Sequence, residues 1–371
     1  MVYLDNAATS FPKPRRVTEA LNKCVKEYCG NPGRSAHRFS IKSSEKIYET
    51  RSMIAELLNY STPENVVFTL NASYALNLAI KTTVKENSHV IVSDIEHNSV
   101  IRPLTALKKR GVEFSVFSNS AGSQEEIISL LRDNTSCIVA NMTSNVTGEG
   151  ISLKTLYNIK QKYNLKLILD ASQTIGHENI DLEKSSVDVL CAPSHKALFG
   201  IQGAGFAVFC DGEERESFIE GGSGSESKNQ SMPKVLPEHF EAGTLPTPAI
   251  ASLCAGLNFI SEIGISEIEK KLNFLTEELK DRLSSINGVK IFGGAHGIVS
   301  FTHTKYPTNL IAEKLNSKGI AVRSGFHCAP FIHKRLGTDV DGTVRVSLSY
   351  LNKIGDIDKL YKALKFDLSR I

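Results

Sequence analysis

The stretch at residues 187–205, "VDVLCAPSHKALFGIQGAG", decides the fold class of this chain. Its first seven residues form a short apolar run, which is typical of a buried strand. Three polar residues, Ser194, His195 and Lys196, follow at once, and a glycine-rich stretch comes after them. A strand that is apolar throughout and ends in polar residues is typical of a parallel sheet covered on both faces.

Five similar runs precede this one. They are "NVVFTL" (65–70), "SHVIVSD" (88–94), "EFSVFS" (113–118), "SCIVANM" (136–142) and "LKLILDA" (165–171). Helical patterns at 72–84, 99–111 and 152–164 lie between several of them. Strands that alternate with helices predict an α/β fold with a mainly parallel sheet. The run "GAGFAVFC" (203–210) predicts one more strand, for which an antiparallel direction is open.

The last third of the chain has a different pattern. After a Gly- and Ser-rich loop at 220–234, two long amphipathic patterns at 247–264 and 265–288 meet near Gly264. The apolar runs that follow, with helices between them, predict a smaller α+β domain. We predict a large domain of residues 16–258 and a small domain formed by residues 1–15 and 259–371.

The composition is that of an ordinary globular protein. The 371 residues are 41% hydrophobic and 22% charged, and the formal net charge is +3. This mild charge gives no reason to expect a nucleic acid or a membrane surface as the main partner. The beginning "MVYLDNAATS" has no basic n-region, so we expect no secretory signal. Seven scattered cysteines without a CxxC pair argue against a disulfide framework and a metal site, and favour a reducing cytoplasm.

Polar residues follow four of the predicted strands. They are Ser73, His97, Asp170 and Lys196. Taken singly, Ser73 is an ordinary helix cap, Asp170 a turn residue and Lys196 a surface lysine. Ligands of α/β sheets bind at the carboxyl ends of the strands, so four such residues at one edge predict a binding site.

These four side chains suit pyridoxal phosphate. The cofactor needs an amine for a Schiff base, supplied by Lys196, and an acid beside its pyridine nitrogen, supplied by Asp170. The helix that starts near Ser73 offers free N–H groups to a phosphate. His97 can lie flat against the ring, and we expect the glycines after Lys196 to let the backbone approach the cofactor.

Nine blocks of sequence, taken in order, resemble the class V aminotransferase family of fold-type I pyridoxal phosphate enzymes. Within that family the chain resembles the cysteine desulfurases and selenocysteine lyases. The blocks are "YLDNAATSFPKP", "FTLNASYALNLAI", "EHNSVIRP", "NVTGEG", "LILDASQTIGH", "SHKALFGIQGAG", "FEAGTLPT", "RSGFHCAP" and "VRVSLSYLN". They cover essentially the whole chain.

The resemblance implies roles for single residues around the cofactor. Lys196 would carry the cofactor, Asp170 would pair with its pyridine nitrogen, and Gln173 would contact its ring hydroxyl. His97 would stack on the ring and take part in catalysis. Further cofactor contacts would come from Ser73, Ala72, Ser194 and His195, and from Thr244 of a neighbouring subunit, which implies a homodimer.

The resemblance also implies a substrate site, in which Asn145 and Arg345 would hold the carboxylate of an amino acid. His37 in "GRSAHRFS" matches a substrate-site histidine of the family. Two positions depart from the pattern. Two residues before His195 the family usually has Ser or Thr, and this chain has Pro193. Ala72 stands where many relatives have Thr, so we expect the details of phosphate binding to differ.

The segment "RSGFHCAP" (323–330) contains one cysteine, Cys328, with four possible roles: metal ligand, disulfide partner, buried filler or nucleophile. Its spacing from His327 and His333 matches no structural zinc pattern. Alone, a cysteine is more often a buried residue. Beside a cofactor site, and with the family loop "RxGxxCA", the nucleophile is favoured, on a flexible loop that lets it reach the substrate. The other six cysteines are expected in the core, and His327 is not assigned as a base because neighbours in an extended segment point apart.

The sequence therefore predicts a cysteine desulfurase that converts L-cysteine to L-alanine and forms a persulfide on Cys328. The sulfur would pass to an acceptor protein. The alternatives are a selenocysteine lyase acting on L-selenocysteine, a cysteine sulfinate desulfinase, a transaminase or epimerase, and a non-catalytic scaffold.

Overall fold

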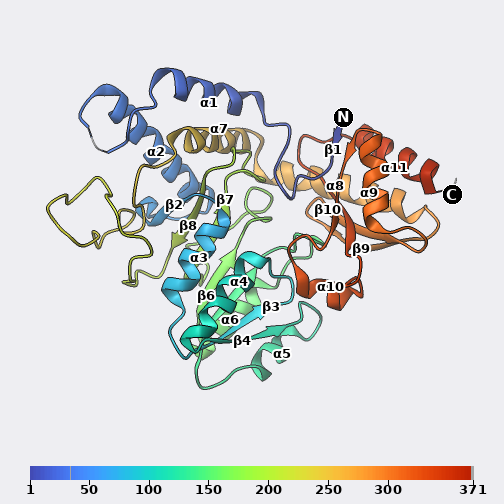
Figure 1. The fold of residues 1–371 in the computed structure, drawn as a ribbon, viewed down its shortest axis with the longest axis horizontal. Helices are drawn as coiled ribbons and strands as arrows, with labels where there is room; N and C mark the ends of the chain where they lie inside the picture. The colour runs from blue at the N-terminus through green and yellow to red at the C-terminus, as the bar shows by residue number, and fades with distance from the viewer. Residues whose placement is uncertain (34, 369–371) are drawn as a thin grey trace.

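The computed structural model describes residues 1–33 and 35–368, and a seven-stranded sheet forms its centre (Figure 1). The strand order is β2-β8-β7-β6-β5-β3-β4. The strands are β2 (Val66–Thr69), β3 (His89–Ser93), β4 (Glu113–Phe117), β5 (Thr135–Asn141), β6 (Lys166–Asp170), β7 (Val189–Pro193) and β8 (Gly205–Phe209). All seven lie where the sequence predicts a strand.

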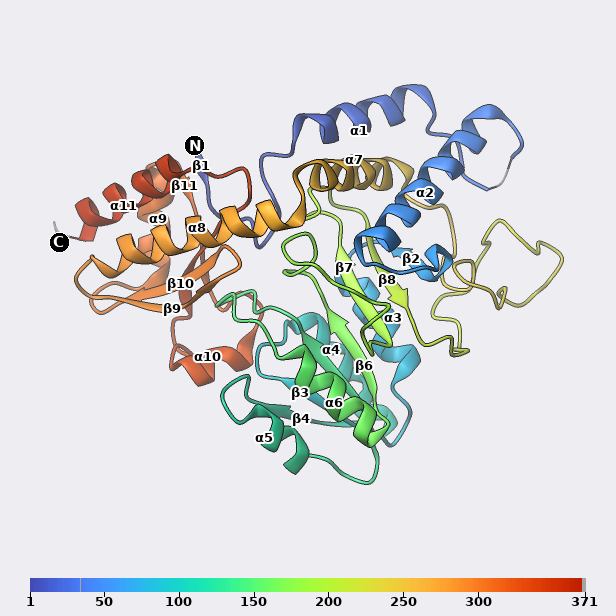
Figure 2. The same ribbon diagram turned by 180° about the vertical axis from the view of Figure 1, so that it is seen from behind.

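Both faces of this sheet are buried because successive side chains of each strand enter different clusters. In β3, Val90 and Val92 pack in one cluster with α3 (Ala72–Thr83) and α4 (Asn98–Leu107). Ile91 packs on the other face. That second cluster includes side chains of α2 (Arg38–Leu57), α5 (Ser123–Ser129), α6 (Leu153–Tyr163) and α7 (Thr247–Ile263), while α1 (Arg15–Glu27) lies outside α7 (Figure 2). This burial explains why strands such as β3 and β6 carry consecutive apolar residues instead of an alternating pattern.

Only β8 runs against its neighbours β2 and β7. The other six strands are mutually parallel, so their carboxyl ends meet at one edge of the sheet. This confirms the predicted α/β fold and settles the direction of β8. It also places the residues that follow β2, β3, β5, β6 and β7 next to one another.

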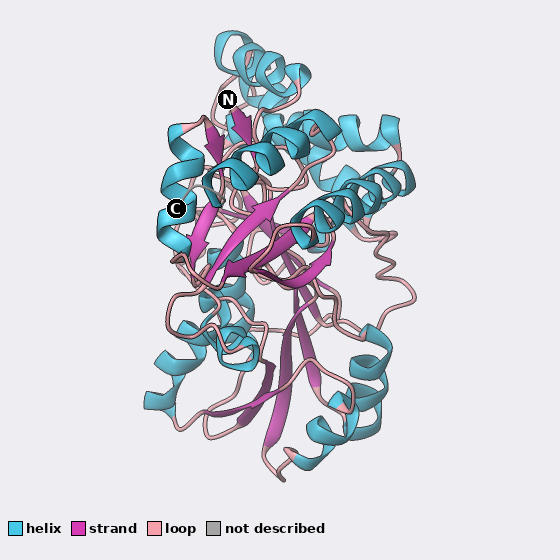
Figure 3. Cartoon of the chain, turned by 90° about the vertical axis from the view of Figure 1, so that its right-hand side faces the viewer, coloured by secondary structure: helices cyan, strands magenta, loops and turns pink. Residues whose placement is uncertain are grey.

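The C-terminal part forms a second, antiparallel sheet of order β12-β13-β10-β9 (Figure 3). Its strands are β9 (Val289–Ala295), β10 (Ile298–His303), β12 (Arg323–Gly325) and β13 (Thr343–Ser347). The helices of this part are α8 (Ile265–Ser284), α9 (Thr308–Ser317), α10 (Pro330–Leu336) and α11 (Ile354–Leu368). The N-terminal β1 (Val2–Tyr3) pairs with β11 (Ile320–Ala321), so the first residues join this sheet region.

The predicted smaller α+β domain is therefore confirmed as an architecture. The exact boundary between residues 258 and 259 falls inside α7 and stays a prediction. Within the described residues no single helix is both long and apolar enough to cross a bilayer. Of the helix pairs in these residues, only α7 and α8, bent by 82° where they meet, reach that length and composition together.

Candidate active site

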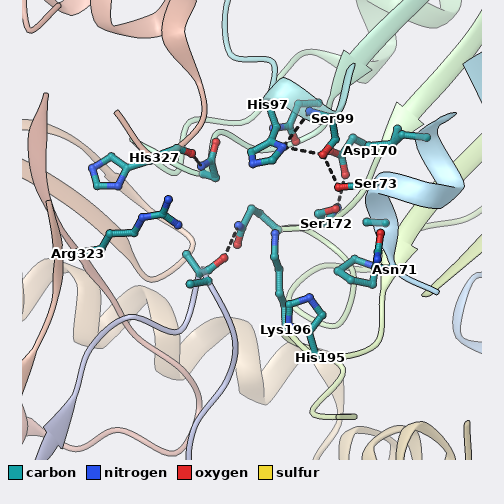
Figure 4. Close-up of a pocket in the computed structure, with 18 of the residues that line it drawn as sticks. Asn71, Ser73, His97, Ser99, Asp170, Ser172, His195, Lys196, Arg323 and His327 are labelled. Atoms are coloured by element: carbon teal, nitrogen blue, oxygen red, sulfur yellow. Dashed lines mark hydrogen bonds between the residues drawn. The ribbon is translucent and has the colours of Figure 1, made fainter. Parts of the chain in front are cut away.

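A cavity of about 200 Å³ opens at the carboxyl edge of the central sheet (Figure 4). Side chains of both sheets line it, because Arg323 and Arg345 reach it from β12 and β13. Nine predicted site residues are among its lining residues: Ala72, Ser73, His97, Asn145, Asp170, Gln173, His195, Lys196 and Arg345.

Lys196 and Asp170 come from neighbouring strands β7 and β6 and face the same cavity. Burial lowers the pKa of Lys196 to about 8, against the opposing effect of the Asp170 charge. A substantial fraction of this amine is therefore neutral near pH 7.5. Asp170 is buried, and its Oδ1 accepts a hydrogen bond from the backbone N–H of Ser172 at 2.9 Å. The pair combines a nucleophilic amine with a fixed carboxylate.

His97 is held in one tautomer. It caps the start of α4, where its Nδ1 accepts a hydrogen bond from the Ser99 N–H at 3.1 Å. Burial, together with the nearby Lys196 charge, lowers the pKa of His97 to about 4 despite the opposing charge of Asp170. The imidazole is thus neutral with its proton on Nε2, a flat ring on one wall of the cavity. Ser99 Oγ lies 2.5 Å from Ser73 Oγ, which links this wall to the start of α3.

The start of α3 lies against β8. Its cap is Asn71, whose Oδ1 accepts from the Tyr74 N–H at 3.0 Å. A Cβ on Gly205 would come within 2.6 Å of the Asn71 carbonyl carbon, so only glycine allows this approach. Residues 200–205 do not line the cavity of this chain, so the approach of these glycines to a cofactor stays a prediction. Gly205 instead positions the helix start whose free N–H groups face the cavity.

The Lys196 loop is fastened to an N-terminal segment. The carbonyl oxygen of His195 accepts from the Ser10 N–H at 3.0 Å and from Lys13 Nζ at 2.9 Å. Ser10 Oγ donates to the carbonyl of Lys196 at 2.8 Å. Burial, with the Lys196 and Lys13 charges, lowers the pKa of His195 to about 4, and its Nδ1 is buried without a partner. A neutral, unsatisfied imidazole nitrogen is a group that a ligand can complete.

A buried carboxyl, Glu96, lies behind this wall and is fully excluded from solvent. Burial raises its pKa to about 8, although Ser93 and the Asn141 N–H both hydrogen-bond to Oε1. Its Oε2 has no partner. Glu96 is therefore neutral near pH 7, next to the ionised groups of the cavity.

Arg345 is almost completely buried, at 1% exposure, and carries two contacts. Its Nη2 pairs with Asp5 Oδ1 at 2.6 Å, and its Nη1 donates to the Asn145 carbonyl at 2.9 Å. Its Nε has no partner. Of the five N–H groups of the guanidinium, three remain for a ligand in the cavity.

Cys328 is exposed and stands next to His327, which lines the cavity, without lining it itself. Its Sγ is 3.6 Å from Nη2 of Arg323, which lines the cavity. His327 and Cys328 both have left-handed backbone conformations, with φ of 48° and 59°. The expected extended geometry is therefore wrong here. His327 nevertheless has no role as a base, because Nε2 lies 3.1 Å from the Thr343 carbonyl and burial lowers its pKa to about 2.

The comparisons with known proteins agree with this geometry. A family model described as aminotransferase class-V matches residues 2–360. The chain belongs to the class V aminotransferase family. A "Probable cysteine desulfurase" of Methanothermobacter thermautotrophicus is 32% identical over 378 residues, which cover 98% of this chain and 94% of that protein. One of Pyrococcus abyssi is 28% identical with the same two coverages. The solved apo structure of the cysteine desulfurase from Thermococcus onnurineus NA1 superposes with a TM-score of 0.91 at 26% identity, covering 100% of this chain and 95% of that one.

Members of the class V aminotransferase family are pyridoxal phosphate enzymes, and the fold-type I architecture predicted from the sequence is confirmed. The cavity fits that cofactor. It offers an amine and a carboxylate on adjacent strands, and a helix start with a hydroxyl at Ser73. The unpartnered Nδ1 of His195 adds a buried polar atom to which a ligand could hydrogen-bond.

Four predicted residues do not line the cavity: Cys328, described above, and Ser194, Thr244 and His37. Ser194 is buried and its Oγ donates to the Ile201 carbonyl at 2.6 Å, so the structure contradicts a phosphate contact from this side chain. Thr244 and His37 are both exposed on loops or helix ends away from it. Their roles as contacts across a subunit interface stay predictions.

Sequence reasoning missed several members of the class V site. Arg323 stands five residues before Cys328 in the quoted family loop, which was the available signal. Asp5 and Ser99 carried no signal of their own, because only the folded chain brings them to Arg345 and His97. Cys29 is exposed, which corrects its expected place in the core: it follows the end of α1. Among the described residues no group of His, Cys, Asp or Glu could hold a metal ion.

Proposed function

We propose that this protein is a pyridoxal phosphate-dependent cysteine desulfurase. It converts L-cysteine to L-alanine and collects the sulfur on Cys328. The observation that carries the proposal is an exposed cysteine whose sulfur lies 3.6 Å from Arg323, a lining residue of the cavity that contains Lys196 and Asp170. The relatives named as cysteine desulfurases support it.

The cofactor would occupy the carboxyl edge of the sheet. Ser73, the backbone N–H groups of α3 and His195 would hold its phosphate. Asp170, His97 and Gln173 would surround its ring, with Gln173 fixed by donation to the Ala7 carbonyl at 2.9 Å. Bound there, pyridoxal phosphate supplies an electron sink for negative charge developing on the substrate Cα.

Lys196 is the group that moves the proton of the substrate Cα. Its pKa of about 8 leaves the amine partly neutral at physiological pH, as a general base requires. The carboxylate of the substrate would take the free N–H groups of Arg345, with the Asn145 side chain beside them. His97, neutral with its proton on Nε2, offers a flat face and a donor without adding charge.

Cys328 accepts the sulfur. Its thiolate sulfur attacks the sulfur of the substrate, forming an S–S bond as the substrate Cβ–S bond breaks. The electron pair of the broken bond stays with the carbon fragment, which takes up a proton and leaves as alanine. The Arg323 guanidinium, 3.6 Å from Sγ, provides a counter-charge for the thiolate.

The active form is proposed to be a homodimer, in which Thr244 of one subunit completes the phosphate site of the other. We also propose a cytoplasmic setting with a protein as sulfur acceptor. The seven cysteines are all free thiols, which suits a reducing compartment.

The test is to incubate the holoenzyme with L-cysteine, measure alanine and sulfide, and locate the persulfide by mass spectrometry. We expect equal amounts of alanine and sulfane sulfur, with the extra sulfur on Cys328. Lys196→Ala should abolish the reaction. If Cys328→Ala releases sulfide from cysteine as fast as the unchanged enzyme, the persulfide step is wrong.

Two substrates distinguish the other candidate activities. Selenocysteine and cysteine sulfinate carry better leaving groups, so their breakdown depends less on Cys328. If Cys328→Ala retains full activity on these substrates and the unchanged enzyme barely acts on cysteine, the protein is a lyase or desulfinase instead.

A further inference from the structure

The carboxylate site at Arg345 already contains a carboxylate of the protein. Asp5, in the N-terminal segment after β1, pairs with Arg345 Nη2 through Oδ1 at 2.6 Å. The Asp5 side chain is 21% exposed, whereas that of Arg345 is 1% exposed. Arg345 lines the cavity, and Asp5 contacts its guanidinium without lining the cavity itself.

Backbone contacts fix Asp5 independently of this ion pair. Residue 5 forms a bridge with Ser347 of β13, and the Ser347 N–H donates to the carbonyl of Leu4 at 2.7 Å. The Tyr3 hydroxyl donates to the Asp5 carbonyl at 3.2 Å. Asp5 therefore stays beside Arg345 when its side chain is changed, and a substitution tests the carboxylate alone.

Only some N–H groups of the Arg345 guanidinium remain for a substrate carboxylate. Nη1 is engaged by the Asn145 carbonyl and Nη2 by Asp5, so the unpartnered Nε–H and one N–H on each terminal nitrogen remain. A second carboxylate bound to the same guanidinium lies within a few ångström of the first. Like charges at such a distance oppose each other, most strongly in a buried site.

We propose that Asp5 is a positioning residue that weakens the hold of Arg345 on amino acid carboxylates and so speeds the release of alanine. This rests on the proposed function, in which substrate and product share one carboxylate site. A grip that is equally strong on cysteine and alanine lowers KM without raising kcat. Asp5 limits this equal binding of substrate and product, while Arg345 can still orient the substrate carboxylate.

The experiment compares the unchanged holoenzyme with Asp5→Asn, which keeps the shape and removes the charge. Binding of L-alanine is measured by calorimetric titration. We expect Asp5→Asn to bind alanine at least tenfold more tightly, with a lower KM for cysteine and no gain in kcat. Ethylamine, which is alanine without its carboxylate, should bind both proteins equally.

Further variants separate this role from a structural one. Asp5→Glu retains the charge and should keep alanine affinity near the original value, while Asp5→Ala repeats the loss of charge if the asparagine variant folds poorly. Glu241→Gln is the control, because it breaks a buried pair with Arg51 away from the cavity, and it should leave alanine affinity unchanged. Unchanged or weaker alanine binding by both neutral variants, or an equal gain for ethylamine, overturns the proposal. The unchanged enzyme is tested separately for alanine and sulfide production, so failure of the proposed function is seen independently.

Discussion

Glu96 provides the sharpest test of the site's electrostatics. Its carboxyl is buried without solvent contact, and burial raises its pKa from 4.5 to about 8. In an unfolded chain the same group ionises near 4.5. Between these two values the folded protein holds a proton that the unfolded chain has lost, so the free energy of unfolding falls as the pH rises. The stabilising contribution is complete below pH 4.5 and is lost through pH 8.

The size of this effect follows from the two pKa values. The full difference corresponds to about 5 kcal/mol, of which about 3 to 4 kcal/mol is lost between pH 5 and pH 8. Glu96→Gln imitates the protonated acid, and its oxygen can still accept from Ser93 and the Asn141 N–H. We therefore expect the variant to lose none of this contribution over the same range.

The assay is denaturant unfolding of the two holoenzymes at pH 5 and pH 8. Glu125→Gln makes the same chemical change on the exposed face of α5 and is the matched control. The stability of Glu96→Gln relative to the unchanged protein should rise by a few kcal/mol from pH 5 to pH 8, while the control stays level. Parallel profiles for all three proteins would refute the claim that Glu96 is neutral in the folded state.

Three further predictions test single contacts. Arg323→Met removes the cation beside Cys328 and should slow alkylation of that thiol by iodoacetamide about fivefold, since exposed ion pairs contribute at most about 1 kcal/mol. An unchanged rate would show that Arg323 does not activate Cys328. Gly205→Ala forces the start of α3 to shift, at a cost of about 1–3 kcal/mol, and should lower both the melting temperature and the affinity for pyridoxal phosphate in an absorbance titration; wild-type affinity would show that this helix start does not hold the phosphate. Burial opposes charge on His296, but its hydrogen bond to Glu178 raises its pKa above 6.5 overall. The stabilisation from this charge pair is therefore complete below pH 6.5 and is lost as the pH rises through the raised pKa. His296→Gln should destabilise the protein more at pH 6 than at pH 9 in denaturant unfolding, and an equal loss at both pH values would contradict the charge pairing.

The strands and the main cavity residues were predictable because each carries a local signal. The runs at 88–94 and 165–171 each carry three consecutive apolar residues, 90–92 and 167–169, whose side chains enter clusters on both faces, as in a sheet covered on both sides. Parallel strands then bring their ends to one edge, so His97 and Asp170 meet although 73 residues separate them in the chain. The parallel order of the strands therefore brings the four polar strand ends predicted from the sequence into one cavity.

Contacts between distant backbone segments left no such signal. Asp5 meets Arg345 across almost the whole chain, and a lone aspartate after a short strand predicts only a turn. Ser194 failed as a phosphate contact for a different reason: its side chain satisfies the Ile201 carbonyl within the loop that the glycines form. In both places the direction of the side chain depends on packing that no local pattern encodes.

The mobility predicted for the Cys328 loop is also decided by such contacts. The Asn98 N–H donates to the Cys328 carbonyl at 2.7 Å, and Asn145 Nδ2 donates to the His327 carbonyl at 2.8 Å. Both donors belong to the large α/β part, one directly after His97 and the other within the cavity wall. The backbone of Cys328 is therefore attached to the segments that carry His97 and Asn145, for which we propose ring stacking and carboxylate binding. Since the side chain of Cys328 is already exposed, we expect rotation of that side chain, rather than opening of the loop, to bring its sulfur to a substrate or an acceptor.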